Sequence, residues 1–120
     1  MLEVDKKFGL QVNRYIADAK YWNDKNIKFQ SCFMIFLHVP KKERKTIFSN
    51  IKKNLHIGGN LFIEGFSVQQ MQYHSGGPLD PNLLYDTQTI IQELSSFTLI
   101  KSNITEEFLD DAPGHVGLAS

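Results

Sequence analysis

Apolar residues are spaced along this chain in two ways, which predict strands and helices in alternation. Phe29–Val39 (FQSCFMIFLHV) is a nearly continuous apolar run, typical of a central strand covered on both faces of a sheet. Leu61-Phe62-Ile63 is a shorter run of the same kind. Leu10–Ala17 instead alternates between apolar and polar residues, interrupted only by Arg14, and predicts a strand with one buried face. A further strand is predicted at Phe97–Ile104.

Helical spacing is clearest from Pro40 to Leu55. Proline fits the first turn, and the basic segment Lys41–Lys45 predicts a solvated helix face. The face that packs on the sheet is predicted from apolar residues at helical spacing, namely Ile47, Phe48, Ile51 and Leu55. A second helix is predicted from Pro81 to Leu94, with a less regular apolar face. Alternating strands and helices indicate an α/β domain with a parallel sheet.

Composition limits the partners that this chain is expected to have. Its 120 residues, 42% of them hydrophobic, suffice for one domain spanning 1–120. Because 13 basic residues balance 13 acidic ones, no bulk charge draws the chain to nucleic acid or to a membrane. No apolar run is long enough to span a bilayer, and the first residues lack the order of a signal peptide. The single cysteine, Cys32, lies in an apolar run and favours a reducing compartment, so we expect a cytoplasmic protein with a buried structural thiol.

The stretch Ile57–Asp80 (IGGNLFIEGFSVQQMQYHSGGPLD) carries most of the candidate chemistry. Gly58-Gly59 predicts a turn before the short strand, and Glu64 places a carboxylate where that strand ends. In an open α/β sheet, ligands bind in the crevice outside the carboxyl ends of the strands. The polar loop that follows has the donors, acceptors and aromatic surface that such a site needs. A solvated connection with no role is the equally weighted alternative.

Two strings in this stretch, GGNLFIEGF and QMQYHSGGPLD, resemble the C-terminal half of a class I S-adenosylmethionine-dependent methyltransferase. More narrowly, they are similar to the small bacterial branch described as tellurite-resistance-like. The glycine turn and strand occur in many methyltransferases, whereas the QYHSGGPLD loop is much more specific. The resemblance runs from about Phe8 to the end of the chain. It implies a partial Rossmann-like sheet with flanking helices that lacks the first two strands of the family. It also implies that His115–Ala119 begins the last strand.

The resemblance also implies a donor site for S-adenosyl-L-methionine. Asp18, just after the third strand of the family, would accept a hydrogen bond from the adenine amino group, and Ala19 would pack near the ring. His38, in the HVP sequence after the fourth strand, would lie beside the methyl donor as a general base or a polar contact. The residues alone leave alternatives open: a turn or cap aspartate at Asp18, and at His38 a ring whose nitrogens bind the backbone.

A small-molecule methyl acceptor is the partner that the resemblance implies for the loop. The residues expected to contact it are Phe66, Gln72, Tyr73, Gly76 and Gly77. No metal site is expected. The acceptor class is left open between thiol, metalloid oxyanion, amine and protein side chain, because pocket shape rather than motif selects it.

One element of the family is missing from these residues. No glycine-rich loop lies between a strand and a helix, and no acidic residue follows a second strand, although these hold the donor. We therefore expect a truncated methyltransferase-like chain that is inactive by itself. The alternatives are a non-catalytic interaction module that self-associates through exposed strand edges, and a fragment without function. In all three cases the strand at Leu10–Ala17 would lack the neighbouring strand that the family has beside it in the sheet.

Overall fold

The computed structural model describes residues 6–23, 26–72, 77–112 and 115–120, with the backbone alone for Met71, 107–112 and 115–118. Its main elements are β1 (Phe29–Ile35), α2 (Lys41–Asn54), β2 (Leu55–Glu64), α3 (Thr87–Glu93), β3 (Glu107–Ala112) and β4 (His115–Ala119). Short 3-10 turns span Val68–Gln72 and Pro81–Leu83. The protein is thus a small α/β domain, as the sequence predicts. No helix in the described part of the chain is long and apolar enough to cross a membrane.

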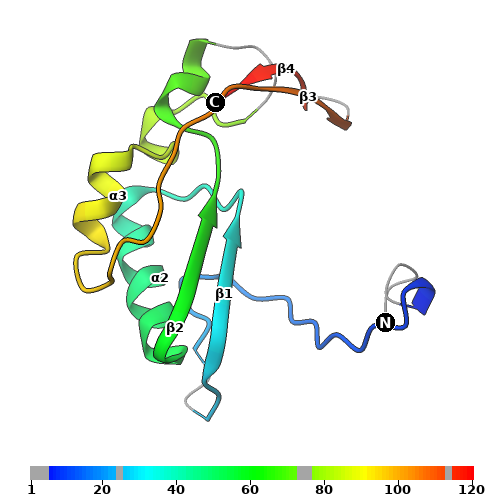
Figure 1. Cartoon of the computed structure of the whole chain (residues 1–120), viewed down its shortest axis with the longest axis vertical. Coiled ribbons are helices and arrows are strands. Elements are labelled where there is room, and N and C mark those ends of the chain that lie inside the picture. The colour runs from blue at the N-terminus through cyan, green and yellow to red at the C-terminus, as the bar shows by residue number, and fades with distance from the viewer. Residues whose placement is uncertain (1–5, 24–25, 73–76, 113–114) are drawn as a thin grey trace.

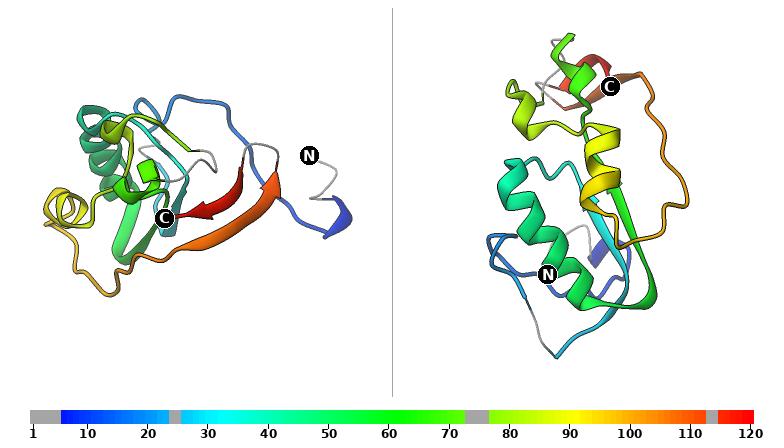
Figure 2. Two further views of the ribbon diagram at one scale, coloured as in Figure 1. Left: turned by 90° about the horizontal axis from the view of Figure 1, so that it is seen from above. Right: turned by 90° about the vertical axis from the view of Figure 1, so that its left-hand side faces the viewer.

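A parallel pair of strands joined by a helix forms the centre of the molecule. β1 and β2 pair in parallel, in register from Ser31 opposite Asn60 to Ile35 opposite Glu64. α2 connects them, since parallel strands need a crossover rather than a tight turn. Figure 1 shows that both strands end at the same edge of the sheet, and Figure 2 shows α2 and α3 together over one face.

The core lies between that face and the two helices. Its buried members are Met34 of β1, Ile47 and Phe48 of α2, and Tyr85 from the connection to α3. Ile51 and Ile63 pack against them. Each fully buried side chain of this size contributes roughly 1.5–3 kcal/mol as an upper estimate. The helix predicted from Pro40 is confirmed, as is its apolar face at Ile47, Phe48 and Ile51, but Leu55 is the first residue of β2 rather than part of the helix.

The opposite face of the sheet is open, so the prediction that both strands are covered on two sides is wrong. Phe33 and Phe62 are 65% and 49% exposed, and their rings stack on this face with centroids 4.7 Å apart. Ile35 is also exposed. The reason is that both helices pack on the other side, and no described element forms a second layer. A continuous apolar run therefore does not prove two-sided burial.

Gly58 and Gly59 lie inside β2 rather than in a turn before it, contrary to the prediction. Gly58 nevertheless adopts φ +83°, in the left-handed region that glycine tolerates. The pairing register of the two strands shifts on β1 between Phe29 and Ser31, opposite this part of β2. The glycine pair thus interrupts regular pairing without ending the strand.

Two of the predicted strands do not form. Leu10–Ala17 and Phe97–Ile104 have no strand structure, and Ile16 is fully exposed. A strand needs a partner for its backbone groups, and the N-terminal segment extends away from the body of the molecule (Figures 1 and 2). The radius of gyration is accordingly 15.9 Å, compared with ~14 Å for a compact domain of this length.

The helix predicted over Pro81–Leu94 is divided into two pieces. Leu84 and Tyr85 leave the helical path and are buried, and α3 starts only after Asp86, whose carboxylate accepts from the Thr89 N–H. The strand predicted at His115–Ala119 is confirmed as β4. It pairs with β3, an antiparallel strand that the acidic 105–111 segment did not predict.

Candidate functional site at the carboxyl ends of the parallel strands

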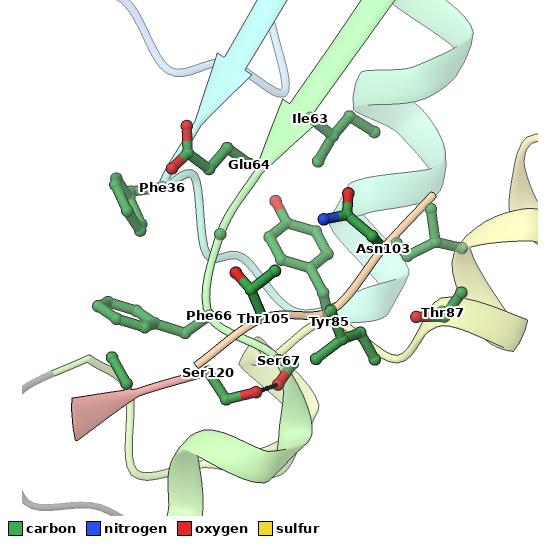
Figure 3. A pocket seen from close by; sticks show the side chains of 14 residues that line it. Phe36, Ile63, Glu64, Phe66, Ser67, Tyr85, Thr87, Asn103, Thr105 and Ser120 are labelled. Carbon is green, nitrogen blue, oxygen red and sulfur yellow. Dashed lines mark hydrogen bonds between the residues drawn. The ribbon is translucent and has the colours of Figure 1, made fainter. Parts of the chain in front are cut away.

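An open pocket of about 390 Å³ lies where β1 and β2 end. This is the position where α/β sheets bind ligands, and the volume is within the range of small-molecule sites. Figure 3 shows side chains from several segments of the chain around it. The lining residues are Phe36, Ile63, Glu64, Gly65, Phe66, Ser67, Tyr85, Thr87, Ile90, Asn103, Ile104, Thr105, Ala119 and Ser120.

Two residues at the strand ends hold each other in place. The Phe36 N–H donates to the Glu64 carbonyl oxygen at 2.7 Å, which continues the pairing one step beyond β1. Phe36 adopts φ +50°, a left-handed conformation that is an outlier for a bulky residue. The bend presents the Phe36 ring to the pocket beside the Glu64 side chain (Figure 3).

Gly65 allows the chain to pass close to two rings. A Cβ at this position would lie 2.3 Å from Tyr85 Cε2 and 3.2 Å from His38 Cε1, so only glycine fits. The Tyr85 hydroxyl donates to the Leu37 carbonyl oxygen, and burial raises the pKa of Tyr85 to about 12. The Tyr85 phenol therefore stays neutral and forms a wall of the pocket rather than an acid or base.

Ser67 and Ser120 form the side of the pocket nearest β4. Their hydroxyls are hydrogen-bonded to each other (Figure 3), with the two oxygens 2.7 Å apart. The Ser67 N–H also donates to the Ser120 carbonyl oxygen at 2.7 Å. The Ser120 N–H donates in turn to Oε1 of Gln70, a side chain only 2% exposed. These bonds fix residues far apart in the sequence against one another.

His38 lies behind the pocket, and the backbone occupies both of its ring nitrogens. Nδ1 is 2.7 Å from the Leu83 carbonyl oxygen, which can only accept, so Nδ1 carries the proton. The Phe66 N–H donates to Nε2 at 3.3 Å, so Nε2 uses its lone pair there. Burial lowers the pKa of His38; the Leu83 contact opposes this, and the charge of Arg44 adds to it. In this arrangement the ring is neutral and has no lone pair free to take a proton.

Three of the residues predicted for catalysis or acceptor binding lie together. His38 stacks on Phe66 with ring centroids 5.6 Å apart. Gly77, at φ +79°, packs on the Phe66 ring so closely that a Cβ at Gly77 would lie 2.8 Å from Phe66 Cδ2. Gln72 is exposed and does not line the pocket. Tyr73 and Gly76 lie outside the described residues.

Of the three residues predicted to contact the donor, two, Asp18 and Ala19, lie away from His38 and the pocket. Asp18 Oδ1 accepts from the Lys20 N–H at 2.9 Å, and the Asp18 carbonyl accepts from Tyr21 and Trp22. This is the turn geometry that the sequence left open for an aspartate. Ala19 packs against the helix–sheet core, and neither residue lines the pocket.

Arg44 corrects the prediction of a solvated basic face on α2. Its side chain is 1% exposed and binds Glu93 of α3 through Nε to Oε2 at 3.0 Å and Nη2 to Oε1 at 2.5 Å. The guanidinium also lies 5.4 Å from the centre of the Tyr85 ring. Helical spacing could have revealed this burial, since Arg44 stands three and four residues before Ile47 and Phe48. For Phe36, Tyr85 and Asn103 the sequence carries no such signal.

No family model matches the sequence, and a search of curated proteins finds no match. Among the described residues, no group of three His, Cys, Asp or Glu side chains could hold a metal ion. Cys32 is half-buried, and burial raises the pKa of its thiol, so the reactive thiolate is disfavoured at neutral pH.

Proposed function

We propose that this chain carries the acceptor-binding half of a class I S-adenosylmethionine-dependent methyltransferase, a partial Rossmann-like fold. One observation supports the proposal most: the stretch Ile57–Asp80, which bears the sequence resemblance, also supplies Glu64, Gly65, Phe66 and Ser67 to the pocket. The parallel pair of strands around α2 is compatible with the fourth and fifth strands of that family.

The acceptor would lie against Phe66, whose ring is also in contact with His38 and Gly77. Methyl transfer needs chiefly a nucleophile and a sulfonium held in line, so positioning is the main contribution expected from this half. A base role for His38 would require Nε2 to leave the Phe66 N–H first. Gln72, Tyr73 and Gly76 keep their proposed role as further acceptor contacts.

The donor would need elements that these residues do not supply. The sequence contains no glycine-rich loop between a strand and a helix, and Asp18 and Ala19 do not line the pocket. We therefore expect calorimetric titration of the chain with S-adenosylmethionine to give negligible heat. Micromolar binding would contradict the importance that we assign to the missing loop.

A fusion tests the proposal directly. The strand–glycine loop–helix half of a class I methyltransferase is joined ahead of Phe8, and folding is checked by NMR. We expect the fusion to bind S-adenosylmethionine, and Asp18→Ala to weaken that binding about tenfold by removing one charge-assisted hydrogen bond. Asp80→Ala, another exposed turn carboxylate outside the pocket, serves as the control. A folded fusion without donor binding would refute the proposal.

A non-catalytic interaction module is the second candidate. It is favoured by the exposed Phe33–Phe62 stack and by the strand edge of β1 that no described element pairs. Self-association of the chain through this open face distinguishes this candidate from the first.

A further inference from the structure

We propose that the part of the pocket formed by Phe36 and Glu64, beside the buried Phe66, binds an organic cation, with a quaternary ammonium group between the carboxylate and the Phe36 ring. The inference goes beyond the proposed function, because it concerns the charge of the ligand. It holds whether or not the chain takes part in methyl transfer.

The charge of the pocket is the first argument. Glu64 is the only charged side chain among the described residues that line it. No ion pair joins its carboxylate to another side chain in the described part of the chain; Lys20–Glu43 and Arg44–Glu93, two ion pairs found there, do not involve Glu64. An anionic ligand would meet a negative charge and no cationic side chain, whereas a cation would gain a partner.

The aromatic rings are the second argument. The Phe36 and Phe66 centroids lie 5.1 Å apart with the ring planes tilted by 42°, so the Phe66 ring, only 6% exposed, packs against the Phe36 ring. Phe36 is 46% exposed, which leaves part of its surface open to a ligand. Figure 3 shows the Glu64 carboxylate and both rings on the same side of the backbone at Gly65. Aromatic faces beside a carboxylate are the usual recognition elements for alkylated cations.

The backbone of Phe36 is the third argument. A phenylalanine at φ +50° is a conformational outlier, and such outliers cluster at ligand-binding sites. The hydrogen bond from the Phe36 N–H to the Glu64 carbonyl ties the strained residue to the residue that carries the charge. The two recognition elements are therefore held in a fixed relation before a ligand arrives.

The remainder of the pocket indicates what else the ligand carries. Asn103 and Thr105 offer an amide and a hydroxyl on the other side of Gly65, together with the Thr87 hydroxyl. A small molecule with a cationic group at one end and a hydroxyl or amide at the other would satisfy both sides. Choline is a simple probe of this kind, and 3,3-dimethylbutan-1-ol has the same shape without the charge.

The test is a titration of the full chain with each probe, followed by amide chemical shifts. We expect choline to shift the signals of Phe36 and of residues 64–67 and to bind about tenfold tighter than the neutral alcohol. Equal binding of the two probes would overturn the proposal, and so would binding of inorganic phosphate at the same residues. S-Adenosylmethionine is titrated in parallel; if it binds there and choline does not, the cation alone is not what is recognised and the proposal fails.

Two variants assign the effect to the site. Glu64→Gln keeps the shape of an exposed side chain and should abolish the preference for choline over the alcohol. Glu43→Gln removes the same charge outside the pocket and should change nothing. Phe36→Leu keeps a bulky apolar group but no aromatic face, and should weaken choline binding several-fold. Choline binding unchanged in both Glu64→Gln and Phe36→Leu would refute the proposal.

Discussion

The ring of His38 faces an acceptor at one nitrogen and a donor at the other. The Leu83 carbonyl requires a proton on Nδ1, and the Phe66 N–H requires a lone pair on Nε2. Protonation of Nε2 would set two N–H groups against each other in a half-buried place. The neutral Nδ1–H tautomer is therefore selected by the backbone, and His38 joins the end of β1 to two later segments.

This geometry predicts a pH dependence of stability. Burial lowers the pKa of His38 in the folded chain below its ordinary 6.5, so the unfolded chain binds the proton first. The free energy of unfolding should therefore fall as the pH drops below about 6.5, and His38 contributes nothing to this slope at higher pH. Urea unfolding at several pH values measures it, and NMR of the ring nitrogens reports the tautomer.

His38→Asn is the comparison, because it removes the titrating ring. In this variant the free energy of unfolding should change less with pH below about 6.5 than in the wild-type chain. An equal slope in both proteins, or a His38 ring that titrates above its ordinary value, would show that the two backbone contacts do not persist in solution.

At this scale the sequence identified some residues and missed others for clear reasons. Phe66 and Gly77 belong to a specific motif, and His38 ends an apolar run, so pattern alone singled them out. Phe36 belongs to the same run, and only its left-handed backbone distinguishes it. Tyr85 and Asn103 reach the pocket through tertiary packing, which no local pattern encodes.

At the scale of elements, α2 and α3 are joined by the ion pair of Arg44 and Glu93. Arg44 is buried, its Nη1 has no hydrogen-bond partner among the described residues, and Glu93 neutralises its charge. Such a pair need not add net stability, but removing one partner leaves a charge in the core. The position of the short helix α3 on the sheet therefore depends on Glu93.

Glu93→Leu should lower the free energy of unfolding by about 3 kcal/mol, because it leaves the Arg44 guanidinium buried without a counter-charge. The double variant Arg44→Met/Glu93→Leu should recover most of this loss, since it buries no charge. Denaturant unfolding measures both. Glu43→Gln, which breaks the more exposed pair with Lys20, is the control and should have little effect. A double variant as unstable as Glu93→Leu alone would contradict this account.

The elements that the sequence predicted correctly are those that local pattern determines. α2 has a full apolar face, and β1 and β2 contain runs that pair with each other through the crossover. Leu10–Ala17 has the alternation of a strand, but no described strand lies beside it to pair with its backbone, so it does not form a strand. The division of the helix predicted over Pro81–Leu94 follows from burial of Leu84 and Tyr85, a tertiary effect that outweighs helix spacing.

At the scale of the whole molecule, the sheet has one covered face and one open face. The open face carries the stacked Phe33 and Phe62 rings, with Ile35 beside them. Exposed apolar surface of this kind on a strand pair usually marks a contact with another layer or chain. The formal net charge of zero provides no repulsion between copies.

The chain should therefore self-associate through this face as its concentration rises, with an apparent mass above the 13.8 kDa of the single chain in sedimentation velocity. Phe33→Ser should weaken association about tenfold, because it removes an aromatic stack and its apolar area from the contact. It should leave the fold intact, since Phe33 is 65% exposed. Ile100→Ser is the matched control, because Ile100 is equally apolar and 84% exposed but lies outside the sheet. A wild-type chain that remains monomeric at every concentration would show that the open face does not bind a second copy.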